Sequence, residues 1–229
     1  MNKKSLIIIT VILLFISTMF INASPLKTIF LNLGNNHKTA LEESTADNDK
    51  STDYIVINPK IKISYDSLYE ELNLLSVTNN MSDNDLAEQA VNEVLQQEIM
   101  VSYVKSLGYE VSENEFEDYK KSLVDSLQAS DNYNEIANYF DGFGGINEYF
   151  SSMEHRLKDS LLVRKFLDDE RIRYANLNGY DEKDADFVEI WNQKENEIIK
   201  EQMNNNHISD EKKQQLLEVA TEYLSDKAK

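Results

Sequence analysis

The chain has 229 residues, 41% of them hydrophobic and 28% charged, a balance typical of a globular body of one domain with room for an appendage. Its 41 Asp and Glu residues outnumber 23 Lys and Arg residues. The resulting net charge of −18 repels phosphate backbones, so we expect no nucleic-acid partner. Cysteine is absent, which excludes disulfides, thiolate metal sites, thiol catalysis and a lipid attached at a cysteine.

Residues 1–23 have the layout of an export signal, because Lys3 and Lys4 precede an apolar run over 6–21. That run is shorter than the ~20 residues of a comfortable membrane span. Ala23 fits a cleavage site whereas Lys27 fits an uncleaved anchor, so a signal peptide and a membrane anchor both stay open. In either case the body is predicted to be extracytoplasmic, either secreted or anchored to the outer face of the cytoplasmic membrane of a Gram-positive bacterium. If the segment is uncleaved, it provides the contact with the membrane.

The next segment, residues 24–53, is predicted to be a flexible linker. Its stretch over 35–53 holds few apolar side chains and many Asn, Asp, Ser and Thr residues. Such a composition buries too little surface to offset the entropy of ordering the chain. We therefore expect His37, which lies in this stretch, to be a solvated polar residue.

Ordered structure is predicted to begin with two short strands. A β-prone run over 54–57 is followed by a turn at Asn58 and Pro59, and alternating Ile residues over 61–63 indicate the second strand. A helix with leucines on one face follows, at positions 68, 72 and 75. The pattern predicts a β-hairpin that leads into a helix.

Three long helices are predicted between residues 83 and 178. The first spans about 83–107 and stops at Gly108, a residue suited to the left-handed helix end. Ser112 and Glu115 have the spacing of a capping box for the second, which runs to about 127. The third begins near Asn147, after the breaker "DGFGG", and ends before Gly179.

Two further helical patterns fill the C-terminal segment, residues 180–229. One carries Phe187, Ile190, Trp191 and Ile198, and the other opens at Ser209. These helices either fold back on the main lobe, with Trp191 as an anchor, or form a peripheral arm.

The sequence contains no pattern of an active site. None of its three histidines lies in an HExxH motif, "DGFGG" lacks the GKS or GKT ending of a phosphate loop, and no GxSxG elbow occurs. His155 is expected on a helix surface and His207 in a loop. We therefore predict no enzyme activity, no catalytic residue, no cofactor and no metal.

Aromatic residues crowd both sides of the glycine turn. They are Tyr133, Tyr139, Phe140, Phe143, Tyr149 and Phe150. One interpretation is helix-core packing at a tight corner. The other is a concave apolar lining that accepts an extended peptide, since aromatic rings offer adaptable contact area. In this second interpretation the peptide-binding residues are Tyr139, Phe140, Phe143, Tyr149 and Phe150.

The chain resembles a known family over residues 54–175. "VINPKIKISYDSLYEEL" is similar to the opening "VVNGxxIT…EL" of the N-terminal chaperone region of SurA and of PrsA-type foldases. "AVNEVLQQEIMVSYVKSLGYEVSENEFEDY" resembles the family's long helix, Leu-Gly turn and Val-Ser-x-x-Glu restart. "GGINEYFSSMEHRLKDSLLVRKFL" resembles the helix that follows. The resemblance implies an extracytoplasmic helical domain that cradles unfolded polypeptide.

The chain departs from that family at two points. Pro59 stands where the family usually has Gly. A parvulin-type prolyl isomerase domain often follows in the family, yet only fifty residues remain after Gly179 and they read as helices. A peptidyl-prolyl isomerase is therefore the weakest candidate function.

We thus expect a mainly α fold with a short N-terminal β-hairpin, in which residues 54–179 form a SurA-N-like domain. The predicted function is chaperone-like binding of unfolded or secreted polypeptides, with a homodimer left open. The alternative is an extracytoplasmic protein that docks one specific partner.

Overall fold

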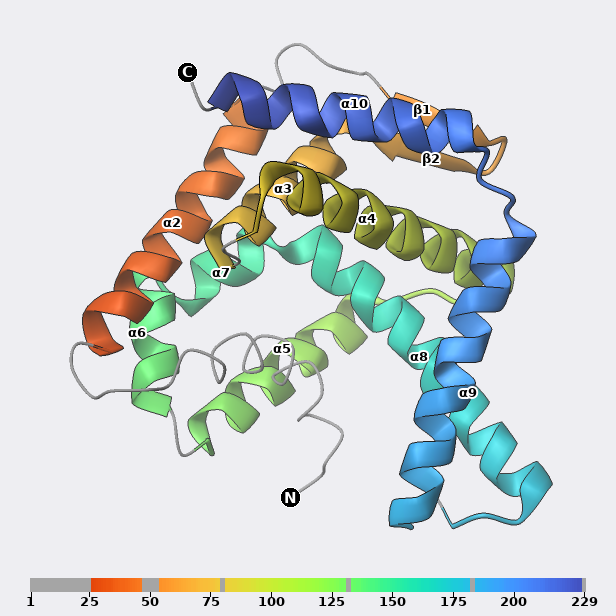
Figure 1. Cartoon of the computed structure of the whole chain (residues 1–229). Coiled ribbons are helices and arrows are strands. Elements are labelled where there is room, and N and C mark those ends of the chain that lie inside the picture. Colours follow the sequence, from red (N-terminus) through yellow and green to blue (C-terminus); the bar gives the residue numbers. More distant parts are fainter. Residues whose placement is uncertain (1–25, 47–53, 79–80, 131–132, 182–183, 228–229) are drawn as a thin grey trace.

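The structure, a computed structural model, describes residues 26–46, 54–78, 81–130, 133–181 and 184–227 (Figure 1). Within these ranges it is mainly helical, with one small two-stranded antiparallel sheet, as predicted. The elements are α2 (Leu26–Ala46), β1 (Tyr54–Asn58), β2 (Ile61–Ser64), α3 (Tyr65–Thr78), α4 (Asp83–Ser106), α5 (Glu113–Gln128), α6 (Tyr133–Phe143), α7 (Ile146–Ser152), α8 (Glu154–Asn178), α9 (Ala185–Asn205) and α10 (Asp210–Lys227).

The structure corrects the prediction of a flexible linker. Residues 26–46 form the 21-residue helix α2, which packs along α6 and against α3. The prediction failed because the stabilising contacts of α2 come from distant parts of the chain rather than from its own polar composition. The rest of that expected linker, and the predicted signal or anchor segment at 1–23, lie outside the described residues.

The predicted β-hairpin is confirmed, with Ile55 opposite Ile63 in antiparallel register. Its turn is held by the Asn58 side chain, whose Oδ1 accepts hydrogen bonds from the backbone nitrogens of Lys60 and Ile61 at 2.9 and 3.1 Å. Both isoleucines of the pair are buried, so one face of the small sheet belongs to the core.

The predicted boundaries of α4 and α5 are also confirmed. Gly108 has a φ of +87°, a conformation that suits glycine just beyond a helix end. At the start of α5, Ser112 accepts a bond from the Glu115 backbone, and the Glu115 carboxylate accepts one from the Ser112 nitrogen at 2.8 Å. The Lys165 ammonium, the Ser112 groups and this capping geometry lower the pKa of Glu115 to about 2. The same carboxylate thus joins α5 to α8.

The single helix predicted from residue 147 to residue 178 is two helices. The chain turns at Met153, which ends α7 and caps α8 with φ of −101°. Both Tyr149 and Met153 are buried, so the turn directs two successive helices along one core. The pattern of apolar residues continues through the turn, which is why the sequence did not reveal it.

Four clusters of buried side chains hold the described residues together. The largest two lie among α2, α5, α6 and α7, and among the sheet, α3, α4 and α10. A smaller cluster joins α4 to α8, and the smallest lies between α8 and α9. In Figure 1, α10 runs along the top of the molecule over the sheet, with α4 below it, while α8 and α9 extend together away from them.

The C-terminal helices meet the body in different ways. Leu216 and Ala220 bury α10 against the core formed with α3 and α4. In contrast, Trp191 packs with Ala175 and Phe187, so it anchors α9 to α8. None of the described helices combines the length and the apolar character that a membrane span requires.

Replacing Ser112 with Ala should reduce the free energy of unfolding by about 1 kcal/mol, because the Glu115 backbone nitrogen at the start of α5 loses the hydroxyl oxygen that caps it. Urea unfolding followed by circular dichroism measures this change. The matched control is Ser122→Ala, at an exposed position in the middle of the same helix. An equal loss in both variants would contradict a capping role.

Candidate functional site

The predicted peptide-binding aromatics do come together, but in the interior. Tyr139, Phe140 and Phe143 on α6 meet Tyr149 and Phe150 on α7, and each side chain is 0–7% exposed. Their rings make edge-on contacts, with centroids 5.2 Å apart for Phe140–Tyr149 and for Phe143–Tyr149. Such edge-to-face geometry is that of a packed aromatic core.

The prediction that these five rings line an open peptide-binding hollow is therefore wrong. They belong to a core that also contains Phe30 and Leu41 of α2 and Phe116 of α5. The error follows from the linker prediction, because α2 covers the face of α6 that was expected to be open. The alternative interpretation, helix-core packing at a tight corner, is the one that the structure supports.

Helix α2 approaches α6 through two glycines. A Cβ added to Gly34 would run into the carbonyl oxygen of Tyr139, and one added to Gly142 would run into the carbonyl oxygen of Leu31. In both cases the obstacle is backbone, which cannot move aside as a flexible side chain can. The close approach of the two helices therefore requires glycine at both positions. Gly34, with Phe30, His37 and Leu41 at 4-3-4 spacing, is the sequence signal that could have revealed α2.

His37 lies inside this contact and is not the solvated residue that was predicted. Its Nδ1 shares a hydrogen bond with the Tyr139 hydroxyl, and its ring stands edge-on to Phe143 with centroids 5.3 Å apart. Its Nε2 is buried and has no hydrogen-bond partner among the described residues. Burial, and then the positive charge of Arg156, lower the pKa of His37 from 6.5 to about 4.

His37 should make the stability depend on pH. Because its pKa is lower in the folded chain, the unfolded chain binds the extra proton between pH 6.5 and pH 4, and stability falls as pH falls through that window. Over this range the free energy of unfolding should fall less for His37→Phe than for the wild type. The difference between the two proteins should reach up to about 3 kcal/mol. Urea titrations at pH 7, 5.5 and 4 measure the difference between the two proteins.

Carboxylates also take up protons between pH 6.5 and pH 4. The effect of His37 is therefore measured as the difference between His37→Phe and the wild type. The control His207→Asn replaces an exposed histidine in the turn before α10, and it should behave as the wild type does. If His37→Phe and the wild type lose the same stability on acidification, His37 does not titrate as the structure indicates.

A buried charged group joins α8 to α3. The Arg156 side chain donates to the Glu71 carboxylate, and its Nη1 lies 3.8 Å from Glu70. Burial alone would lower the pKa of Arg156, but the two carboxylates outweigh it and raise the pKa. His155 is on the helix surface as predicted, with its Nε2 3.4 Å from Glu70. These pairs link the first turn of α8 to α3.

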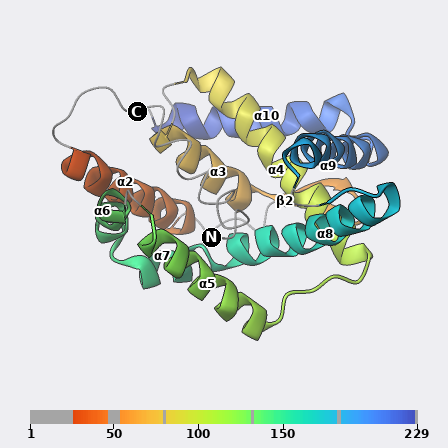
Figure 2. The ribbon, with the colours of Figure 1, turned by 90° about the horizontal axis from the view of Figure 1, so that it is seen from below.

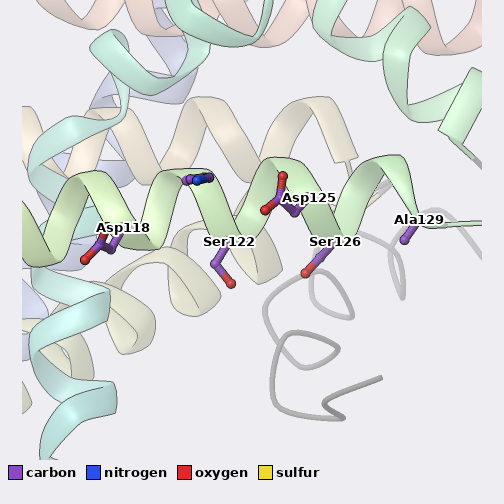
Figure 3. Close-up of a pocket in the computed structure, with 6 residues that line it drawn as sticks. Asp118, Ser122, Asp125, Ser126 and Ala129 are labelled. Atoms are coloured by element: carbon purple, nitrogen blue, oxygen red, sulfur yellow. The ribbon is translucent and has the colours of Figure 1, made fainter.

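A shallow depression of about 340 Å³ runs along α5 (Figure 3). Its described lining comes from one helix face, on which Ser122 and Ser126 point to the same side. Acid–base or nucleophilic catalysis needs groups that converge from several directions. No group of His, Asp and Glu in the described part of the chain is arranged to hold a metal. The lining is Asp118, Lys121, Ser122, Asp125, Ser126 and Ala129.

Exposed apolar side chains gather instead at the free end of α8 and α9. We call the described residues of 172–188 the hairpin tip; they comprise the last two turns of α8, the described part of the connection and the first turn of α9. Of nine exposed large hydrophobic side chains in the described ranges, four lie in the hairpin tip. They are Ile172, Leu177, Tyr180 and Val188, and Leu177 is 73% exposed. None of these four residues belongs to a motif that the sequence marks as functional.

Comparison of the chain with protein-family models, with curated proteins and with solved structures finds no match in any of the three. A function must therefore be argued from the geometry and chemistry of the described residues.

Proposed function

We propose that the chain is an exported, non-catalytic, chaperone-like protein that binds unfolded or secreted polypeptides through the hairpin tip. The observation that carries this proposal is the concentration of exposed apolar side chains at the end of a projecting pair of helices. Export is supported by the basic and apolar pattern of residues 1–23, and chaperone-like binding by the resemblance to the SurA and PrsA type over 54–175.

The α8–α9 hairpin presents its tip away from the rest of the fold. Near its base, Leu162 and Phe166 pack on Val101 and Val104 of α4. Toward its end, Ala175, Phe187 and Trp191 form a separate small core. In Figures 1 and 2 the two helices lie side by side at the opposite end of the molecule from α2 and α6. The tip is thus supported internally while its outer side chains face solvent.

The side chains of the tip suit weak and reversible binding. Leu177 and Tyr180 lie at and just beyond the end of α8, and Val188 lies at the start of α9. Burying a few such side chains contributes ~25 cal/mol per Å², from which the cost of ordering the client must be subtracted. The net binding free energy that remains is small, so a bound client can be released without an energy source.

Charge around the tip favours some clients over others. Residues 168–190 contain eight Asp or Glu and three Lys or Arg in the sequence. Exposed apolar groups set among acidic ones attract unfolded segments that combine apolar and basic residues, and they repel acidic segments. The same charge keeps the exposed apolar groups of separate copies apart.

A light-scattering assay with an aggregating basic client tests this proposal. Protein in up to tenfold excess should reduce the client's scattering, whereas Ile172→Gln with Leu177→Gln should lose about half or more of that effect. The matched control is Met81→Gln with Leu107→Gln, which removes two exposed apolar side chains outside the hairpin. It should act as the wild type does.

Two results would contradict the proposal. One is unchanged scattering of the client at excess wild-type protein. The other is an equal loss of activity in the hairpin variant and the control. Crosslinking in the same mixtures separates the alternative function, since a docking protein would capture one partner stoichiometrically and leave diverse clients untouched.

A further inference from the structure

We propose that the surface covered by α2 is a specific binding site for an amphipathic helix with glycine at its crossing point. We further propose that α2 of a second copy of this chain is the ligand that occupies the site in trans. The site, called here the α2 seat, consists of the faces of α3 and α6 that α2 covers, with Tyr149 from α7. It lies at the opposite end of the molecule from the hairpin tip (Figure 2).

Helix α2 depends on the seat for its structure. It contains Gly34 and a run of Asn35 and Asn36, residues that weaken an isolated helix. It has no acidic residue in its first turn and no basic residue in its last turn, so its ends lack favourable charges. A helix of this composition is marginal alone in water, and the packing against α6 and α3 is what stabilises it. It therefore behaves as a docked ligand of the body.

The seat selects its ligand by shape. At the crossing point Gly34 faces the backbone of Tyr139 and Phe143, and Gly142 faces the backbone of Leu31 and Asn35. This contact is reciprocal, because each helix presents its glycine to the other helix's backbone. Any larger residue at position 34 of the incoming helix separates the two helices, so only a helix with a glycine there fits fully.

Apolar anchors flank the crossing point. Phe30 and Leu41 are buried one turn before and about two turns after Gly34, and both belong to the aromatic core. Lys38 adds only weak pairing, with its Nζ 3.7 Å from Glu42 and 3.9 Å from Glu148 at partly exposed positions. The ligand is thus defined by an apolar–glycine–apolar face, which α2 supplies with Phe30, Gly34 and Leu41.

One polar atom that the docked α2 buries lacks a hydrogen-bond partner in the described part of the chain, which makes replacement of α2 by the α2 of another copy feasible. Docking buries His37 Nε2 without a hydrogen-bond partner among the described residues, and it keeps the imidazole neutral at a pKa of about 4. An unpartnered buried nitrogen costs part of the free energy gained from the apolar contacts. A second copy's α2 restores the same contacts, so exchange between copies has little net cost beyond association.

A peptide titration tests the seat. The probe is a fluorescently labelled peptide of residues 26–46, added to the full chain. It should bind Gly34→Leu protein about tenfold or more tighter than wild type, because the variant's own α2 no longer fits. A probe peptide that itself carries Gly34→Leu should bind neither protein, and Gly142→Leu protein should bind neither peptide. Equal binding of both peptides, or none to the Gly34→Leu protein, overturns the proposal.

A second measurement keeps both glycines, so it does not depend on the folding of the Gly34→Leu or Gly142→Leu protein. Because the chain has no cysteine, Thr39→Cys on α2 and Asp141→Cys on α6 each accept a single label. Donor-labelled and acceptor-labelled proteins should show energy transfer after mixing that rises with concentration. Excess unlabelled probe peptide should suppress it, and the peptide with Gly34→Leu should not. Absence of transfer at all concentrations overturns exchange between copies, while leaving the function of the hairpin tip untouched.

Discussion

The packing of Gly34 and Gly142, each against the backbone of the opposite helix, is the constraint on which one half of this molecule depends. It brings α2 against the backbone of α6, and this close approach lets Phe30, His37 and Leu41 reach the aromatic rings behind α6. Without it the rings of Tyr139 and Phe143 would meet water. Two residues without side chains thus determine whether the aromatic cluster is a core or an open surface.

Several elements were predictable because the chain marks them locally. The turn at Asn58, the stop at Gly108 and the capping box of Ser112 and Glu115 each act within a few residues, and the structure reproduces them. Helix α2 carries no capping or stop signal of this kind, and its asparagines outweighed the helical spacing of Phe30, Gly34 and Leu41. Its stability comes from α6, about a hundred residues away in the chain, and a reading of adjacent residues does not detect such contacts.

The candidate site shows the same limit. The sequence correctly placed five aromatic rings near one another, yet it could not establish whether anything covered them. Leu177 and Val188 raised no signal in the sequence, because an apolar residue within a helix reads the same whether its side chain is buried or exposed. Whether an apolar residue is a core residue or a contact residue depends on the partner helix, and partner helices follow from tertiary structure.

The separation of the buried clusters has a mechanical consequence for α8. Arg156 fixes its first turn to α3, and Leu162 and Phe166 hold its middle on α4. Leu177 lies eleven residues beyond Phe166, about 16 Å along the helix axis. Bending by only 10° near Phe166 would therefore carry Leu177 sideways by about 3 Å, roughly the length of one residue of an extended chain. A bend of this kind would reposition the exposed side chains of the hairpin tip without rearranging the small core of Ala175, Phe187 and Trp191.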